Sequence, residues 1–228
     1  MTTADPQLIR CRRVGHTFGT GPNAVMAVRD VSFDIPPRAR IALMGPSGSG
    51  KSTLLHMLAQ LEMPTSGTMS GAVLEAGSGP GPGTIGLVFQ GPSLIPALDV
   101  LENVALPLIL AGASDTQARS AAHAALELLG LGWLERKLPE ELSGGQAQRA
   151  AIARVLACRP CLILADEPTG QLDHATARSV LTVLLQTADT LGAAVLIATH
   201  DPAVAGLLDE VWHMQDGALT GSPEPDTS

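Results

Sequence analysis

The glycine-rich stretch Gly45–Thr53 constrains the fold of this chain more than any other feature. It directly follows an apolar run at Arg40–Met44, which predicts a strand, and it opens a helix-like segment at Lys51–Leu61. A glycine-rich turn between strand and helix lets successive backbone N–H groups point inward, and the helix dipole adds positive potential behind them. The pattern therefore predicts a phosphate-binding loop.

The side chains of this loop fit the phosphates of a nucleotide. Lys51 can reach the β- and γ-phosphates as a point charge, and the Ser52 hydroxyl is placed to ligate a magnesium ion. The residues expected to hold the phosphates are Gly45, Pro46, Ser47, Gly48, Ser49, Gly50, Lys51, Ser52 and Thr53. The alternative is a glycine-rich turn that happens to precede a lysine, and the complete G-x-x-x-x-G-K-S spacing disfavours it.

Further apolar runs predict an α/β fold. The runs at Leu162–Ala165 and Ala193–Ala198 are continuous, not alternating, which is typical of parallel strands covered on both faces. Helix-like segments besides the one after the loop are Gln117–Leu129, Gln146–Ala157 and Ala175–Leu191. Because ligands of such sheets bind at the carboxyl ends of the strands, we expect the functional loops to gather there.

Each of these two apolar runs ends at residues that can act on a bound phosphate. Asp166 can hold the magnesium shell, and Glu167 can orient or deprotonate the attacking water, the usual division in phosphoryl transfer. His200 follows the other run and can donate to the γ-phosphate. The alternatives are an ordinary solvated strand end for the acidic pair and a structural role for the histidine.

A second glycine-rich helix start lies far from the first. Ser143 is suited to cap this helix, and Gly144 and Gly145 leave N–H groups open to an anion before Gln146. Two anion loops would be redundant around one nucleotide in one chain. We therefore expect them to face each other across a dimer.

Composition limits the remaining functions. A net charge of −8 without a basic face gives little reason for direct nucleic acid binding. The longest apolar stretches, such as Val104–Ala111, fall short of the ~20 residues that span a bilayer. Met1–Gln7 lacks the basic start and apolar block of a secretory signal. We therefore expect a cytosolic chain.

The cysteines also indicate a reducing compartment, because there are three of them and no signal peptide. Cys158 and Cys161 have the C-x-x-C spacing, which leaves redox chemistry or a zinc site as alternatives. A thioredoxin-type pair follows a strand and opens a helix, whereas here a predicted helix ends at the first cysteine and a strand begins at the second. This order disfavours redox chemistry, and a zinc site is disfavoured because two cysteines do not make four ligands.

These motifs together closely resemble the ATP-binding cassette (ABC) ATPase family over roughly Leu8–Leu219. The resemblance implies a P-loop NTPase (RecA-like) core, an accessory antiparallel β lobe and an α-helical lobe carrying the signature motif, at about residues 91–157. It implies one ABC ATPase domain over residues 8–220, followed by a flexible tail at 221–228. ATP and Mg²⁺ are the implied cofactors.

The resemblance also assigns roles to single residues. Gln90 matches the glutamine near the magnesium ion, Asp173 lies in the D-loop, and His200 matches the switch histidine. Leu142–Gln146 matches the signature that closes over ATP held by the partner's phosphate loop. Phe18 looks like the aromatic residue that stacks on adenine, although it could instead belong to the core.

Two segments resemble a subgroup that powers lipoprotein release, macrolide and peptide export, and envelope mechanotransmission: Glu102–Pro107 and Asp166–Gly170. Pro37-Arg38, Gln171 and a short stretch before Ile85 depart from the usual pattern. The resemblance places them at a turn, at the dimer seam and in the accessory β lobe, while the catalytic positions are intact.

We therefore expect an ATP-hydrolysing subunit that dimerises around two Mg-ATP, with a second ABC ATPase protomer such as an identical chain. It would drive a separate integral membrane permease from the cytoplasmic face of the membrane. The alternatives are the ATPase of a solute importer and a soluble ABC ATPase of cofactor assembly. The apolar loop Leu94–Leu98 would receive the membrane subunit, unless it is part of the core of the helical lobe.

Overall fold

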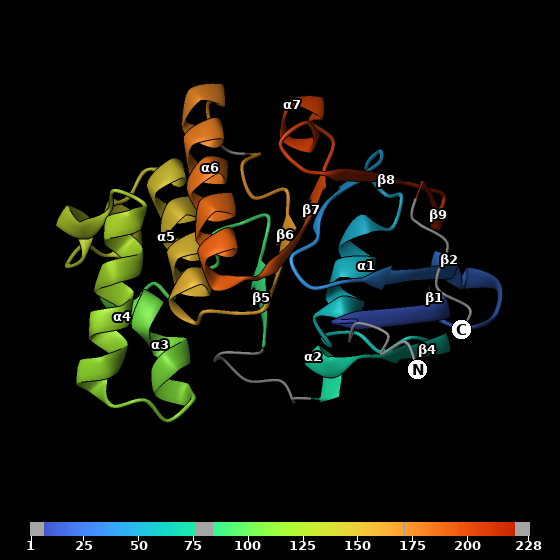
Figure 1. The fold of residues 1–228 in the computed structure, drawn as a ribbon, viewed down its shortest axis with the longest axis horizontal. Helices are drawn as coiled ribbons and strands as arrows, with labels where there is room; N and C mark the ends of the chain where they lie inside the picture. The colour runs from blue at the N-terminus through green and yellow to red at the C-terminus, as the bar shows by residue number, and fades with distance from the viewer. Residues whose placement is uncertain (1–6, 76–83, 171, 222–228) are drawn as a thin grey trace, which may run out of the picture. The chain divides into compact units, whose positions relative to one another are not determined.

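The computed structural model describes residues 7–75, 84–170 and 172–221 (Figure 1). The chain divides into two compact units, Met1–Ser78 with Ala194–Ser228, and Gly79–Ala193. The stretch Gly77–Gly83 is rich in glycine and proline, which predicts a surface turn, and it lies outside the described residues. The departure at Gln171 and almost all of the predicted tail also lie outside them.

The first unit holds two groups of strands. Its strands are β1 (Ile9–Phe18), β2 (Val25–Ile35), β3 (Arg40–Met44), β4 (Ser66–Ser70), β7 (Ala194–Thr199), β8 (Glu210–Gln215) and β9 (Ala218–Thr220). Its helices are α1 (Lys51–Leu58), α2 (Ala72–Glu75) and α7 (Pro202–Ala205), with a 3-10 turn η1 (Gly21–Asn23). An antiparallel sheet has the order β2-β1-β4, as in the expected accessory lobe.

The strands around the phosphate loop form a parallel group, in which β3 lies between β7 and β8 and pairs with both. All six residues of β7 are buried, as expected for an apolar strand covered on both faces. β8 alternates instead, and its Trp212 ring packs 5.0 Å from the ring of Phe33. β9 runs antiparallel beside β8 and completes this group.

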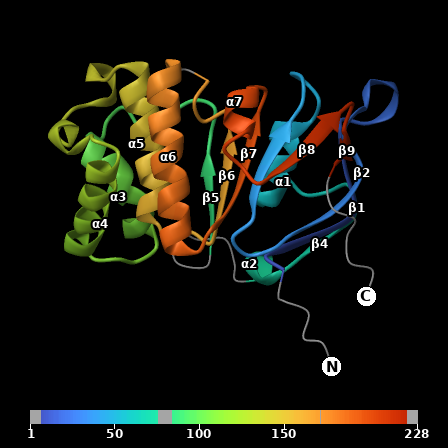
Figure 2. The same cartoon turned by 45° about the horizontal axis from the view of Figure 1, so that its top comes forward.

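The second unit is mostly helical. Its elements are β5 (Ile85–Val88), α3 (Val100–Leu110), α4 (Asp115–Leu128), η2 (Gly132–Leu134), η3 (Pro139–Glu141), α5 (Gly144–Ala157), β6 (Leu162–Asp166) and α6 (His174–Leu191). Figure 2 shows α3, α4 and α5 packed against one another and α5 beside α6. β5 and β6 are parallel neighbours.

The helix boundaries follow from capping residues that the apolar periodicity does not mark. α4 begins after Ser114, whose hydroxyl accepts from the Gln117 N–H while the Gln117 side chain accepts from the Ser114 N–H. α5 likewise begins two residues before the predicted Gln146, because Ser143 caps it. In the described part of the chain, no helix combines the length and the apolar character that a membrane crossing requires.

Candidate functional site

The phosphate loop stands where the sequence predicts it, between β3 and α1 in the first unit. Gly50 adopts φ +104, and a Cβ there would lie 2.2 Å from the Ala27 carbonyl oxygen. The positive φ strains any other residue, and the nearby carbonyl oxygen leaves no space for a side chain. The loop therefore depends on glycine at this position.

Lys51 holds the curl of the loop. Its side chain is buried, and Nζ donates to the Gly45 carbonyl at 2.7 Å and the Pro46 carbonyl at 3.0 Å. An ammonium group has three N–H donors, so these bonds leave one for a phosphate oxygen. The lysine can thus stabilise the loop and meet a ligand at the same time.

Two features of this loop fit a bound phosphate. No described side chain caps the start of α1, so its first backbone N–H groups keep their capacity to donate. The Ser49 hydroxyl is buried and has no hydrogen-bond partner within the described ranges. Because a buried orphan polar group is costly, a phosphate oxygen at this loop would stabilise it.

His200 directly follows β7, which pairs with β3, the strand that leads into the phosphate loop. Met44 pairs with Thr199, so the phosphate loop and His200 leave adjacent parallel strands at the same end. The Thr199 hydroxyl accepts from the Asp201 N–H at 3.0 Å, which shapes the turn after His200. His200 is exposed, as a residue that reaches a ligand must be.

Phe18 ends strand β1 in the same unit and is 43% exposed. A phenylalanine with that exposure is not a core residue, which removes the alternative that the sequence left open. An exposed aromatic face is suited to stacking on a flat base.

In the second unit, the acidic pair stands at the end of β6. Asp166 is buried at the last position of the strand. Glu167 adopts φ +47, in the left-handed region that non-glycine residues rarely visit, and its carbonyl accepts from the Gly170 N–H at 3.1 Å. Such backbone strain concentrates at functional sites because the surrounding structure must hold it.

Gln90 lies next to this pair in the strand register. Val88 pairs with Ala165, so Gln90 and Glu167 each stand two residues beyond paired positions. The Phe89 carbonyl accepts from Nε2 of the buried Gln148 at 3.2 Å. The chain before Gln90 is therefore tied to the signature helix, a contact that the sequence did not reveal.

The signature helix start is partly capped. The Ser143 hydroxyl accepts from the Gln146 N–H at 3.3 Å, and the Gln146 side chain accepts from the Ser143 N–H at 2.8 Å. This is the cap that the sequence predicts from Ser143, and it uses the Gln146 N–H. Gly144 and Gly145 are the first helical residues, whose N–H groups have no carbonyl partner inside a helix.

The D-loop packs beside the signature. A Cβ on Gly145 would lie 2.9 Å from Cδ2 of Leu172, so glycine permits this close approach. Asp173 caps α6 by accepting from the N–H groups of Ala175 at 3.1 Å and Thr176 at 3.0 Å. The side-chain hydrogen bond with Thr176 is the largest cause that lowers the pKa of Asp173, and the two backbone hydrogen bonds lower it further.

The cysteine pair shows no sign of redox activation. α5 ends at Ala157 and β6 begins at Leu162, as the sequence predicts. Burial raises the pKa of Cys158 to about 11 and also raises that of Cys161. Both thiols are therefore held protonated, the opposite of a reactive thiolate.

Asn103 is a buried residue whose role the sequence did not show. Its Oδ1 accepts from the Ile95 N–H at 2.7 Å, and its Nδ2 donates to the Ile95 carbonyl at 3.1 Å. Nδ2 also donates to the carbonyls of Leu98 at 2.9 Å and Asp99 at 3.0 Å. The loop Leu94–Leu98 is thus fixed from α3 while Ile95 stays 40% exposed.

Comparison with known proteins places this geometry in a family. The sequence profile described as ABC transporter matches residues 28–170. The lipoprotein-releasing system ATP-binding protein LolD of Bordetella pertussis is 40% identical, with 92% of this chain and 94% of that protein covered. An uncharacterized ABC transporter ATP-binding protein of Mycobacterium tuberculosis is 41% identical, with 93% and 88% covered.

Similar solved structures indicate the same family. The dimeric post-hydrolysis state of the ATP-binding cassette MJ0796 bound to ADP and Pi has a TM-score of 0.83 at 33% identity, over 95% of this chain and 99% of that one. The chain therefore belongs to the ABC transporter family. Within that family it is an ATP-binding subunit that hydrolyses ATP.

Proposed function

We propose that Gly45–Thr53 binds the phosphates of ATP and that Glu167 positions the water that attacks the γ-phosphate. The phosphate loop carries this proposal, since it combines an uncapped helix start, an orphaned Ser49 hydroxyl and a buried lysine. The site would belong to one ABC ATPase domain over residues 8–220, with the helical lobe at about 91–157.

The oxygen donors expected to hold Mg²⁺ are Ser52, Asp166 and Gln90. Hydroxyl, carboxylate and amide oxygens are the ligand types that this hard cation prefers. When bound, Mg²⁺ would neutralise charge on the β- and γ-phosphate oxygens. Gln90 lies just beyond β5 and Asp166 ends its paired strand β6, which supports their acting on one ion.

The remaining polar residues would orient the reaction. Glu167 stands in a strained turn with φ +47, and its carboxylate would accept a proton from water. His200 would donate to the γ-phosphate, and Phe18 would stack on adenine. Ser143, Gly144, Gly145 and Gln146 of one chain, with Asp173 nearby, would close over the nucleotide in a second chain. Dimeric structures of MJ0796 support that arrangement.

The membrane partner would dock beside the loop Leu94–Leu98. Asn103 holds this loop in place while Ile95 remains exposed, which suits a surface that receives a short helix. Docking there would keep the subunit on the cytoplasmic face of the membrane. Leu94→Glu or Leu98→Glu should prevent membrane recruitment with basal ATPase retained, whereas loss of folding would assign the loop to the core of its lobe.

The names of the relatives support one class of transport. LolD proteins from several organisms, including Caulobacter vibrioides at 41% identity over 95% of this chain and 97% of that protein, are named for lipoprotein release. We infer export or envelope remodelling of this type. A solute importer and a cofactor-assembly ATPase are the remaining candidates.

The catalytic proposal is tested with Glu167→Gln. Turnover of Mg-ATP should fall by about 10²–10⁴, the range for losing a positioned general base, while ATP binding is retained. Glu75→Gln, at an exposed position of helix α2, is the matched control and should keep wild-type turnover. A Glu167→Gln protein with wild-type turnover would remove Glu167 from the role of base.

The transport direction is tested by affinity purification of tagged Glu167→Gln protein from solubilised membranes with Mg-ATP. A partner with few spans and a large extracytoplasmic domain would support export or envelope remodelling. A permease with many spans and a solute-binding protein would support import. Retention of a cytosolic partner alone would overturn the transport proposal and favour the assembly ATPase.

A further inference from the structure

His16 makes a close aromatic contact with Phe18. The two residues lie on β1, and their ring centroids are 4.4 Å apart with the ring planes at 71°. His16 is only 6% exposed, whereas Phe18 is 43% exposed. A buried ring in edge contact with an exposed one limits the orientations that the exposed ring can take.

His16 is itself anchored to the segment that follows α1. Its Nδ1 lies 2.9 Å from the Met63 carbonyl oxygen, and since a carbonyl only accepts, Nδ1 is the donor. Its Nε2 lies 4.0 Å from Oε2 of Glu62. The Glu62 N–H donates to the His56 carbonyl in the last turn of α1. The imidazole thus links the Phe18 strand to the helix that begins at the phosphate loop.

The backbone beside His16 reaches the same loop. His16 pairs with Val28 but Thr17 pairs with Met26, so Ala27 is an extra residue in β2. The carbonyl of Ala27 is the group that lies against Gly50. Strand β1 and the phosphate loop are therefore joined both through the His16 ring and through this bulge.

We propose that His16 is a positioning residue, which fixes the Phe18 ring at a set distance from the phosphate loop. One ATP can then stack its adenine on Phe18 while the loop binds its phosphates. The proposal rests on the proposed function, in which Phe18 stacks on adenine. His16 contacts the stacking residue and not the nucleotide. It should therefore affect recognition of the base and leave recognition of the phosphates unchanged.

The test compares binding of Mg-ATP with binding of inorganic tripolyphosphate, which has the phosphates and lacks the base. His16→Gln keeps an N–H donor for Met63 but removes the aromatic ring. It should weaken ATP binding and raise the KM for ATP by about 2- to 10-fold, the factor that an aromatic edge contact represents. Tripolyphosphate affinity and kcat should stay at the wild-type values. His16→Phe restores a ring and should recover most of the ATP affinity.

A double-mutant cycle with Phe18→Ala completes the test. In that background, His16→Gln should have no further effect on ATP affinity. Equal loss of ATP and tripolyphosphate affinity would show a merely structural histidine, and unchanged ATP affinity in a folded His16→Gln protein would show no role. Either result overturns the proposal, and if His16→Gln does not fold, His16→Phe and Phe18→Ala decide it. Unchanged ATP affinity in Phe18→Ala alone would instead remove the proposed stacking function.

Discussion

At the scale of single residues, Glu167 combines the side chain proposed to position the attacking water with an unfavourable backbone. The left-handed region costs a non-glycine residue about 1–2 kcal/mol, and Glu167 occupies it at φ +47. The proposed role of Glu167 would therefore be retained at some expense of stability.

This conflict predicts that glycine is more stable than alanine at position 167, the reverse of the usual order. Glu167→Gly should unfold with a free energy about 1 kcal/mol higher than Glu167→Ala, because only glycine is relaxed at this φ. Both variants lose the carboxylate, so its contacts cancel in the comparison. Urea unfolding measures the difference. At Ser120, exposed within α4, the order should reverse, with alanine the more stable. Equal free energies of unfolding for Glu167→Gly and Glu167→Ala would argue against strain at this position.

The motif residues could be predicted from the sequence, since each lies within a short pattern whose chemistry is local. Lys51 and Glu167 are such residues. His16 and Asn103 could not be predicted. The partner of His16 at Met63 is 47 residues away, and Asn103 acts through carbonyls that any residue could supply. Roles made by distant or backbone contacts leave no pattern in a single sequence.

At the scale of elements, Asn103 fixes the loop Leu94–Leu98 to helix α3. Asn103→Ala should lower the free energy of unfolding by about 1–3 kcal/mol, because the Ile95 N–H and the carbonyls of Leu98 and Asp99 lose a buried partner. Amide hydrogen exchange at Ile95 should also speed up. Asn23→Ala, at an exposed position in η1, should change stability by less than about 0.5 kcal/mol. Unaltered exchange at Ile95 would contradict this account of the loop.

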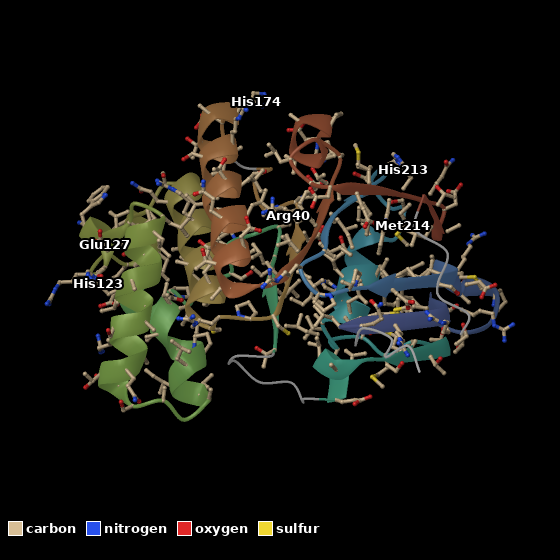
Figure 3. All side chains as sticks on the ribbon, viewed as in Figure 1. Arg40, His123, Glu127, His174, His213 and Met214 are labelled. Carbon is tan, nitrogen blue, oxygen red and sulfur yellow. The ribbon has the colours of Figure 1, made fainter. Side chains whose placement is uncertain are left out.

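Helix α4 is joined to the segment after η2 by a pH-dependent pair. Figure 3 labels His123 and Glu127 on α4. The hydrogen bond from His123 to Glu135 raises the pKa of His123 above its ordinary 6.5, with a smaller contribution from Glu127. The charged imidazole is thus favoured in the folded state. The resulting stability is fully present below the unfolded-state pKa and is lost as the pH rises through the folded-state pKa.

The contribution of this pair is measured by the urea concentration at the midpoint of unfolding. The ionic strength is kept low, because an exposed pair is then least screened. The wild type should exceed His123→Gln at about pH 5.5, and the difference should shrink by about pH 8.5. In a Glu135→Gln background, the pH dependence of this difference should largely disappear. A difference that grows with pH would have the wrong sign for this pair.

Most elements could be predicted because their boundaries have local signals. The strand Arg40–Met44 was predicted with its observed bounds, and α6 was predicted to within one residue at its start. Helix α3 was missed, because its apolar run has no polar face to set a period. The strands β1 and β2 contain bulges that break the alternation expected of a half-buried strand.

At the scale of the whole molecule, the two loops proposed to bind anions belong to two different units. The phosphate loop belongs to the unit containing β3, and the signature helix start belongs to the helical unit. Gly144 and Gly145 have first-turn N–H groups without intrahelical partners, which suits closure over a phosphate held elsewhere. A complete nucleotide site of this kind therefore requires a second chain.

Sedimentation velocity of the Glu167→Gln protein with Mg-ATP or with Mg-ADP tests that requirement most directly. The account predicts a dimer with Mg-ATP, because bound triphosphate is not hydrolysed, and a monomer with Mg-ADP. Adding Lys51→Ala should abolish the ATP-dependent dimer, since the loop loses its buried cation. A Glu167→Gln protein that binds Mg-ATP and remains a monomer at every concentration would contradict the two-chain site.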